Sequence, residues 1–86
     1  MKEQLIRAIA DMVETEGTID VTIETTDFNG IQMVVSPRGV EEGDGTIIVY
    51  LPSGVLTIDT NEIGYDESEN KFVCIGTASV ITLSFE

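Results

Sequence analysis

The 86-residue sequence contains no histidine and no tryptophan, and it has a single cysteine, Cys74. Without histidine, the chain lacks the base of Ser-His and Cys-His catalytic arrangements, the usual zinc ligand and the simplest pH switch. One cysteine also excludes an internal disulfide. Because Cys74 stands in the apolar run of residues 72–75, we expect a buried, inert thiol and not a nucleophile.

Long apolar runs and basic residues are scarce as well. No apolar run approaches the roughly 20 residues of a membrane span, and the N-terminus does not have the pattern of a signal peptide, so we expect a cytoplasmic protein. Sixteen Asp and Glu residues face four Lys and Arg residues, which gives a formal net charge of −12. Such a field repels nucleic acid and anionic membranes, so we expect direct binding to neither. It attracts basic partners, unless it serves solubility alone.

The residues that are present predict one domain over residues 1–86 with an α+β fold. Apolar residues recur at helical spacing over residues 2–16, which predicts an amphipathic helix that Gly17 ends. The remainder predicts a mainly antiparallel, meandering sheet of five or six strands on which this helix packs, with curling toward a partial barrel as one variant. The predicted strands cover residues 18–26, 31–36, 46–51, 55–60, 71–75 and 79–85. Residues 37–45 and 61–70 are predicted as connections, because glycine, acids and other polar residues dominate them.

The most apolar part of the sequence is a predicted hairpin around residues 52–54. Pro-Ser-Gly is typical of a three-residue loop, which would pair Tyr50 with Leu56. Both faces of this hairpin are then apolar, and the helix can cover only one of them. The second face must be covered by curling of the sheet or by another copy of the chain, so a homodimer is an open alternative. That second face, the candidate oligomer surface, carries Val49, Leu51 and Val55.

A second hairpin is predicted between residues 18 and 36. A three-residue loop that begins after Asp27 pairs Ile23 with Val35 and keeps the apolar residues of both strands on one face. We therefore prefer this register to a two-residue Asn-Gly turn, which would mix the faces.

No motif in the sequence indicates catalysis, a cofactor or a metal. Asp66-x-Ser68-x-Asn70 has the spacing that opens an EF-hand calcium loop, but Lys71 replaces its glycine and Thr77 its closing glutamate. The chain has no phosphate-binding glycine loop and no pair of carboxylates set apart among apolar residues. We therefore expect no catalytic residues and no enzyme.

The acidic residues gather in predicted loops and element ends, where binding residues concentrate. Carboxylates spaced over a rigid sheet can imitate phosphates and occupy a basic groove. The candidate partner-binding residues are Glu14, Glu16, Glu41, Glu42, Asp44, Asp59, Glu62, Asp66, Glu67 and Glu69.

In size, charge and predicted fold the chain is similar in type to small phage-encoded DNA-mimic inhibitors, such as inhibitors of uracil-DNA glycosylase and some anti-CRISPR proteins. Tyr65-Asp66-Glu67-Ser68 also resembles a short segment of the phage glycosylase inhibitors. The acids gathered in predicted loops, together with the lack of a catalytic set, predict a small acidic protein that inhibits or masks a basic, nucleic-acid-binding protein surface, as such inhibitors do. The alternative is a structural or assembly subunit that oligomerises through its apolar sheet face, with the acids serving solubility.

Overall fold

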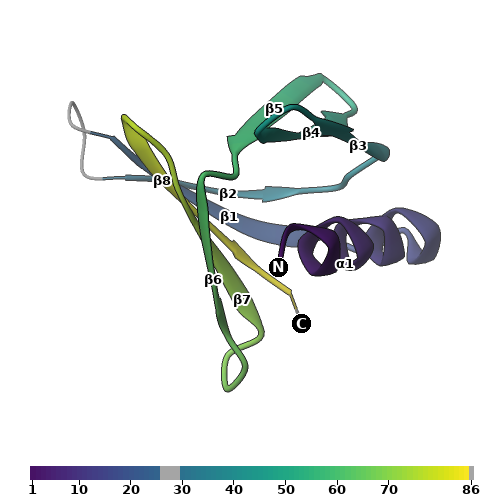
Figure 1. Ribbon diagram of the computed structural model, residues 1–86. Coiled ribbons are helices and arrows are strands. Elements are labelled where there is room, and N and C mark those ends of the chain that lie inside the picture. The colour runs from purple at the N-terminus through teal and green to yellow at the C-terminus, as the bar shows by residue number, and fades with distance from the viewer. Residues whose placement is uncertain (26–29, 86) are drawn as a thin grey trace.

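A computed structural model describes residues 1–25 and 30–85 of the chain. One N-terminal helix, α1 (Lys2–Thr15), precedes eight antiparallel strands that form a five-stranded and a three-stranded sheet (Figure 1). The predicted α+β class is confirmed, and the described strands do not close into a barrel. The strands are β1 (Ile19–Thr25), β2 (Ile31–Val35), β3 (Gly39–Gly43), β4 (Thr46–Leu51), β5 (Gly54–Asp59), β6 (Glu62–Asp66), β7 (Lys71–Ile75) and β8 (Ser79–Ser84).

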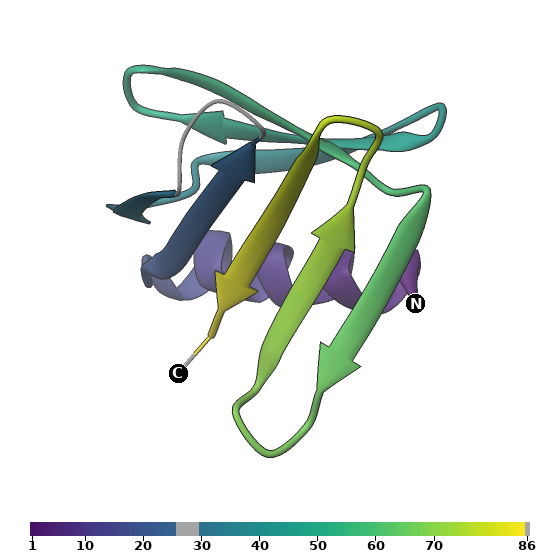
Figure 2. The same ribbon diagram turned by 90° about the vertical axis from the view of Figure 1, so that its left-hand side faces the viewer.

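The helix and the three-stranded sheet lie on the same side of the five-stranded sheet. In Figure 2, α1 crosses behind the five-stranded sheet, and the three-stranded sheet crosses one end of it. The core lies between these layers, and it includes Leu5, Ile9, Val21, Ile47, Val49, Ile58, Phe72, Cys74 and Leu83. No described element covers the opposite face of the five-stranded sheet, so that face is open to solvent (Figures 1 and 2).

The five-stranded sheet has the order β2-β1-β8-β7-β6. In the β1–β2 pair, Ile23 lies opposite Ile31 and Ile19 lies opposite Val35. The predicted pairing of Ile23 with Val35 is therefore wrong. Because the true register differs from it by an even number of residues, the apolar side chains still share one face, as the pattern indicated. Residues 26–29 of the loop between these strands, Asp27 among them, lie outside the described residues.

The β4–β5 hairpin of the three-stranded sheet has a different register from the predicted one. Tyr50 lies opposite Val55, not Leu56, and a two-residue connection joins the strands. Among the described residues, neither Ser53 nor Gly54 has a positive φ, so the glycine bulge of a three-residue loop is absent. The observed register lets Val49 pair with Leu56, which places both on the core side.

This register divides the predicted oligomer surface. Val49 is 1% exposed and belongs to the core, whereas Val55 is 57% exposed on the outer face of the three-stranded sheet. Leu51 packs against the core and is partly buried. A slip of one residue moves side chains to the other face of a strand, which explains why the three do not form one surface.

Two strands, β3 and β6, lie where connections were predicted. The sequence of β3 is Gly-Val-Glu-Glu-Gly, and glycine and glutamate have low strand propensity. Its pairing with β4 and the packing of Val40 against the core provide the stabilisation that local propensity does not. In β6, Ile63 packs against the core in the same way. Both are edge strands, and acidic residues are common on edge strands because they discourage further pairing.

The helix ends one residue earlier than predicted, and Glu16, not Gly17, adopts the left-handed conformation, with φ 56°. The Gly17 N–H donates to the Met12 carbonyl oxygen at 2.8 Å, and the Glu16 N–H donates to that of Val13 at 3.4 Å. These two bonds form a Schellman-type C-terminus, which satisfies carbonyl groups that the helix leaves without partners.

Candidate protein-binding surface

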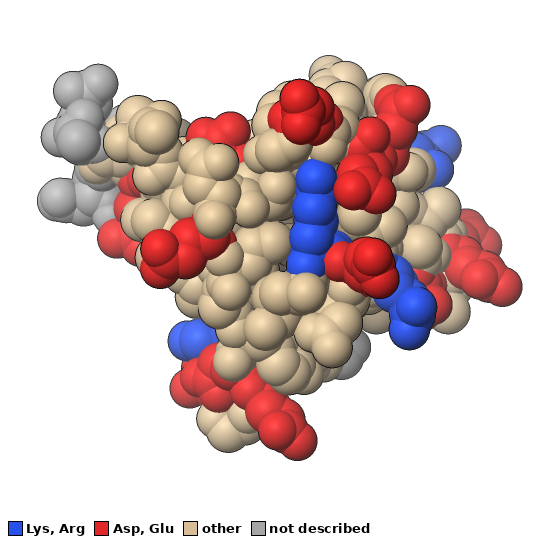
Figure 3. Space-filling view, viewed as in Figure 1, with Lys and Arg blue, Asp and Glu red and all other residues tan. Residues whose placement is uncertain are grey.

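The candidate partner-binding carboxylates all lie at the surface, since no described charged residue is buried. Figure 3 shows acidic side chains at several places on one face, with uncharged surface between them and with Lys or Arg side chains beside some of them. The structure does not bring the candidates together into one patch. It places them in three regions: the three-stranded sheet with its junction to the start of β6, the turn between β6 and β7, and the C-terminal end of α1.

Glu41 and Glu42 are neighbours in β3 but point to opposite faces of the sheet, because side chains alternate along a strand. Glu41 shares the outer face with Tyr50, whose hydroxyl donates to Glu41 Oε1 at 2.5 Å. This hydrogen bond and the negative charge of Glu41 raise the pKa of Tyr50 above its ordinary value. Glu42 faces α1, where its Oε2 lies 3.5 Å from Lys2 Nζ, and the same ammonium donates to the Gly43 carbonyl oxygen at 2.9 Å.

The junction between the two sheets collects acidic residues that are distant in sequence. The Thr60 N–H donates to the Gly45 carbonyl oxygen at 3.0 Å, which holds the end of β5 beside the β3–β4 turn. Asp59 Oδ2 lies so close to Gly76 that an added Cβ would be 2.6 Å from it, so a side chain at position 76 would displace the carboxylate. Glu62 begins β6 opposite Ile75. We call Asp44, Asp59 and Glu62 the junction acids.

The β6–β7 turn uses one of its acids for its own structure. Asp66 Oδ1 accepts hydrogen bonds from the Ser68 N–H at 3.0 Å and from the Ser68 hydroxyl at 2.7 Å, which is an Asx turn. The hydrogen bond from the Ser68 hydroxyl lowers the pKa of Asp66. The Lys71 ammonium lies 2.8 Å from Glu69 Oε1, and this contact raises the pKa of Lys71. The Asn70 amide oxygen accepts from the Tyr65 hydroxyl at 3.0 Å.

Two oxygens that a calcium loop would need, those of Asp66 and Asn70, are therefore engaged inside the turn. Within residues 1–25 and 30–85, no three Asp, Glu or Cys side chains gather in a way that could hold a metal ion.

Glu14 and Glu16 are exposed at the C-terminal end of α1, and the last turn of this helix contains no basic residue. Negative charge at that end opposes the helix dipole. Neither carboxylate therefore has a basic partner in the last turn of the helix, and the helix dipole is unfavourable to the charge of both.

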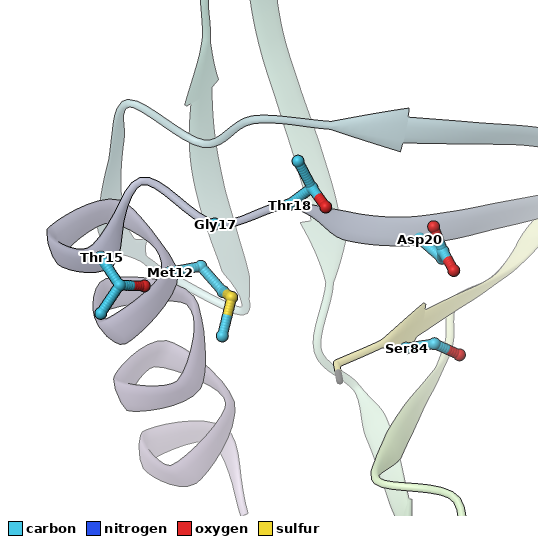
Figure 4. Close-up of a pocket in the computed structure, with 6 residues that line it drawn as sticks. All are labelled: Met12, Thr15, Gly17, Thr18, Asp20 and Ser84. Atoms are coloured by element: carbon cyan, nitrogen blue, oxygen red, sulfur yellow. The ribbon is translucent and has the colours of Figure 1, made fainter.

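A pocket of about 340 Å³ lies between α1 and the start of β1. In Figure 4, Asp20 on β1 and Ser84 on β8 lie side by side, and Met12 and Thr15 of α1 line the other part of the pocket. Asp20 is the one titratable side chain among the lining residues, so the pocket offers no acid–base pair.

Cys74 is buried in the core, as predicted, and burial raises the pKa of its thiol to about 11. Because the thiolate is the nucleophilic form, this residue is unreactive near neutral pH.

Some contacts of the acidic residues could not be foreseen. The pairing of Lys2 with Glu42 joins residues that are distant in sequence, and no local pattern signals it. The bond between Tyr50 and Glu41 depends on the register of β3, a strand that was not predicted. The Asx turn of Asp66 and Ser68, in contrast, has a recognisable Asp-x-Ser pattern.

Comparisons of the chain with protein-family models, with curated protein sequences and with solved structures found no match. In the part of the chain that the structure describes, no helix has the length and apolar character to cross a membrane.

Proposed function

We propose that this chain binds the basic surface of another protein through its acidic residues and masks that surface. The supporting observation is that lysine and arginine side chains of the described chain neutralise few of its carboxylates. Among the described residues two ion pairs form, Lys2 with Glu42 and Lys71 with Glu69. The other candidate carboxylates form no ion pair with a described lysine or arginine, although the charge of nearby Lys71, after the hydrogen bond from Ser68, helps to lower the pKa of Asp66. Most of the acidic charge is therefore available to a partner.

The junction acids are the best candidates for the centre of the contact. Asp44 is in a short turn between two paired strands, and Asp59 and Glu62 are end residues of strands. The backbone at these positions is held by hydrogen bonds and packing, so little conformational entropy is lost on binding. Glu41 extends the acidic surface along β3. Asp66 contributes less, because its carboxylate already serves the β6–β7 turn.

We further propose that the basic surface is one that binds nucleic acid. A groove that holds phosphates presents several lysine and arginine side chains in a fixed arrangement, and carboxylates on a rigid sheet can replace the phosphates. Binding would then compete with nucleic acid and would weaken as salt rises, because long-range charge attraction is screened.

The test begins with capture of partners on the immobilised chain at low salt, elution with salt and identification by mass spectrometry. Binding of the purified partner is then compared between the wild-type chain, the triple variant Asp44→Asn, Asp59→Asn, Glu62→Gln, and the control Glu3→Gln, Asp11→Asn, Glu24→Gln. Both variants have the same net charge. We expect the junction variant to bind at least tenfold more weakly than the control, about 1.4 kcal/mol or more. A DNA duplex should displace the wild-type chain. Equal binding of both variants, or binding that is insensitive to salt, would rule out the proposal.

A further inference from the structure

Strand β2 is an edge of the five-stranded sheet, since within the described chain it pairs with β1 alone. Its sequence, Ile-Gln-Met-Val-Val, contains no charged residue and no proline. Val34 is 65% exposed and Ile31 is 48% exposed. Unpaired backbone groups on an uncharged, β-branched edge strand form a template for another strand.

The other edge strands differ from β2 in one respect. Glu62 and Asp66 are in β6, Glu41 and Glu42 are in β3, and Asp59 is in β5. Acidic side chains on an edge discourage pairing with another chain of the same charge. Charged residues make up 23% of the sequence, and β2 is the one edge strand of the two sheets without any.

We propose that β2 pairs antiparallel with β2 of a second copy of this chain, so that two five-stranded sheets become continuous. Each copy has a net charge of −12, so a contact between copies is favoured where the surface is uncharged. The sequence of β2 is also suited to a two-fold axis at Met33. Gln32 then lies opposite Val34 of the partner subunit, and Ile31 lies opposite Val35 of the partner subunit, so each side chain meets an uncharged one.

The residues around β2 determine the polarity and charge of this interface. Gln32 and Val34 alternate with the core-facing Met33 and therefore lie on the uncovered face of the sheet. Val34 and Val35 line a pocket together with Pro52 and Ser53, so the β4–β5 turn lies beside this end of β2. Asp20, on β1, lies opposite Val34 of β2. The Asp20 carboxylates of the two copies would be three strand spacings apart across the sheet and offset by two residues along it, about 16 Å in all, a distance at which salt screens their repulsion.

The dimer should therefore be strengthened by salt, which is the opposite of the dependence expected for a basic partner. Sedimentation velocity of the full chain over a range of concentrations, at about 0.02 M and about 0.3 M salt, tests this. We expect a monomer–dimer equilibrium whose dimer fraction rises with salt. The variants Val34→Glu and Gln32→Glu should each weaken dimerisation at least tenfold, because each places like charges about 8 Å apart across the two-fold axis.

Thr82→Glu is the matched control, because it adds the same charge to the same face of the sheet on β8, away from the edge. Thermal unfolding checks that all variants fold, and amide exchange compared between dilute and concentrated wild-type protein shows which strand becomes protected. A chain that stays monomeric at both salt concentrations would overturn the proposal, as would a dimer that Val34→Glu leaves intact. The chain could instead form no homodimer but bind a strand of an unrelated protein, in a complex that Val34→Glu abolishes. That result would show that the partner of β2 is not a second copy of the chain.

Discussion

At the scale of single residues, Glu16 combines an unfavourable backbone conformation with an unfavourable charge. Its φ of 56° is one that side chains with a Cβ adopt at a cost of about 1 kcal/mol. Its carboxylate follows a helix whose last turn has no basic residue. A binding residue can retain such costs when its charge is needed elsewhere, which is consistent with the role proposed for the acids.

The substitution Glu16→Gly should therefore raise the free energy of unfolding by about 1 kcal/mol, because glycine adopts positive φ without strain and the charge is removed. Urea denaturation measures the change. Glu14→Gly is the control, and it should lower the stability by about 1 kcal/mol because it places glycine inside the helix. A loss of stability in both variants would contradict the left-handed conformation of Glu16.

Tyr50 and Glu41 give a prediction for alkaline pH. The hydrogen bond to Glu41 and the charge of Glu41 raise the pKa of Tyr50 in the folded chain, so the neutral phenol is favoured by folding. This contribution to stability is complete below the ordinary pKa of about 10 and is lost as pH rises through the higher pKa of the folded state.

An absorbance titration of phenolate should show one tyrosine that ionises above its ordinary range, and Glu41→Gln should move that transition to lower pH. Tyr50→Phe assigns the transition, because the variant should lack it. If Glu41→Gln left the transition unmoved, the hydrogen bond would not be its cause.

At the scale of elements, the β4–β5 hairpin distinguishes the observed register from the predicted one. Val49→Ala should lower the free energy of unfolding by about 2 kcal/mol, because it removes buried methyl groups and leaves a cavity. Val55→Ala should change it by no more than about 0.5 kcal/mol, because Val55 is exposed. Thermal or urea unfolding measures both. In the register of a three-residue loop the two valines would share a face. Equal losses of unfolding free energy in the two variants would therefore support that register and not the observed one.

The sequence predicts some elements well and others poorly, for physical reasons. The helix follows from residues such as Leu5 and Ile9, whose spacing is a property of the local chain. β3 and β6 depend on strands that lie elsewhere in the sequence, and their glycines and acids give no strand signal. The register of the β4–β5 hairpin was predicted wrongly for a related reason. The choice between two turns at residues 52–54 depends on which side chains pack into the core.

The candidate protein-binding surface could likewise be predicted from the sequence only in part. Surface placement of the acids follows from their charge alone. The grouping of Asp44 with Asp59 at the sheet junction depends on the pairing of β4 with β5 and on the hydrogen bond from the Thr60 N–H to the Gly45 carbonyl oxygen, which no local pattern indicates.

At the scale of the whole molecule, the charge of −12 acts in opposite directions on the two proposed associations. It draws a basic partner toward the junction acids, and it drives copies of the chain apart everywhere except at an uncharged surface. Salt weakens the first effect and relieves the second. The two proposals can therefore fail independently, since one depends on Asp44, Asp59 and Glu62 and the other on β2.

The place of β8 between β1 and β7 has a consequence for the order in which the chain folds. The three-stranded sheet and the β6–β7 hairpin join neighbours in sequence, whereas Asp20 pairs with Ser84 from the far end of the described chain. Distant pairings of this kind form slowly, because a long loop must close first. A chain emerging from the ribosome would therefore hold β1 and β7 with open edges until β8 arrives, and we expect this unfinished state to be the one most in need of a chaperone.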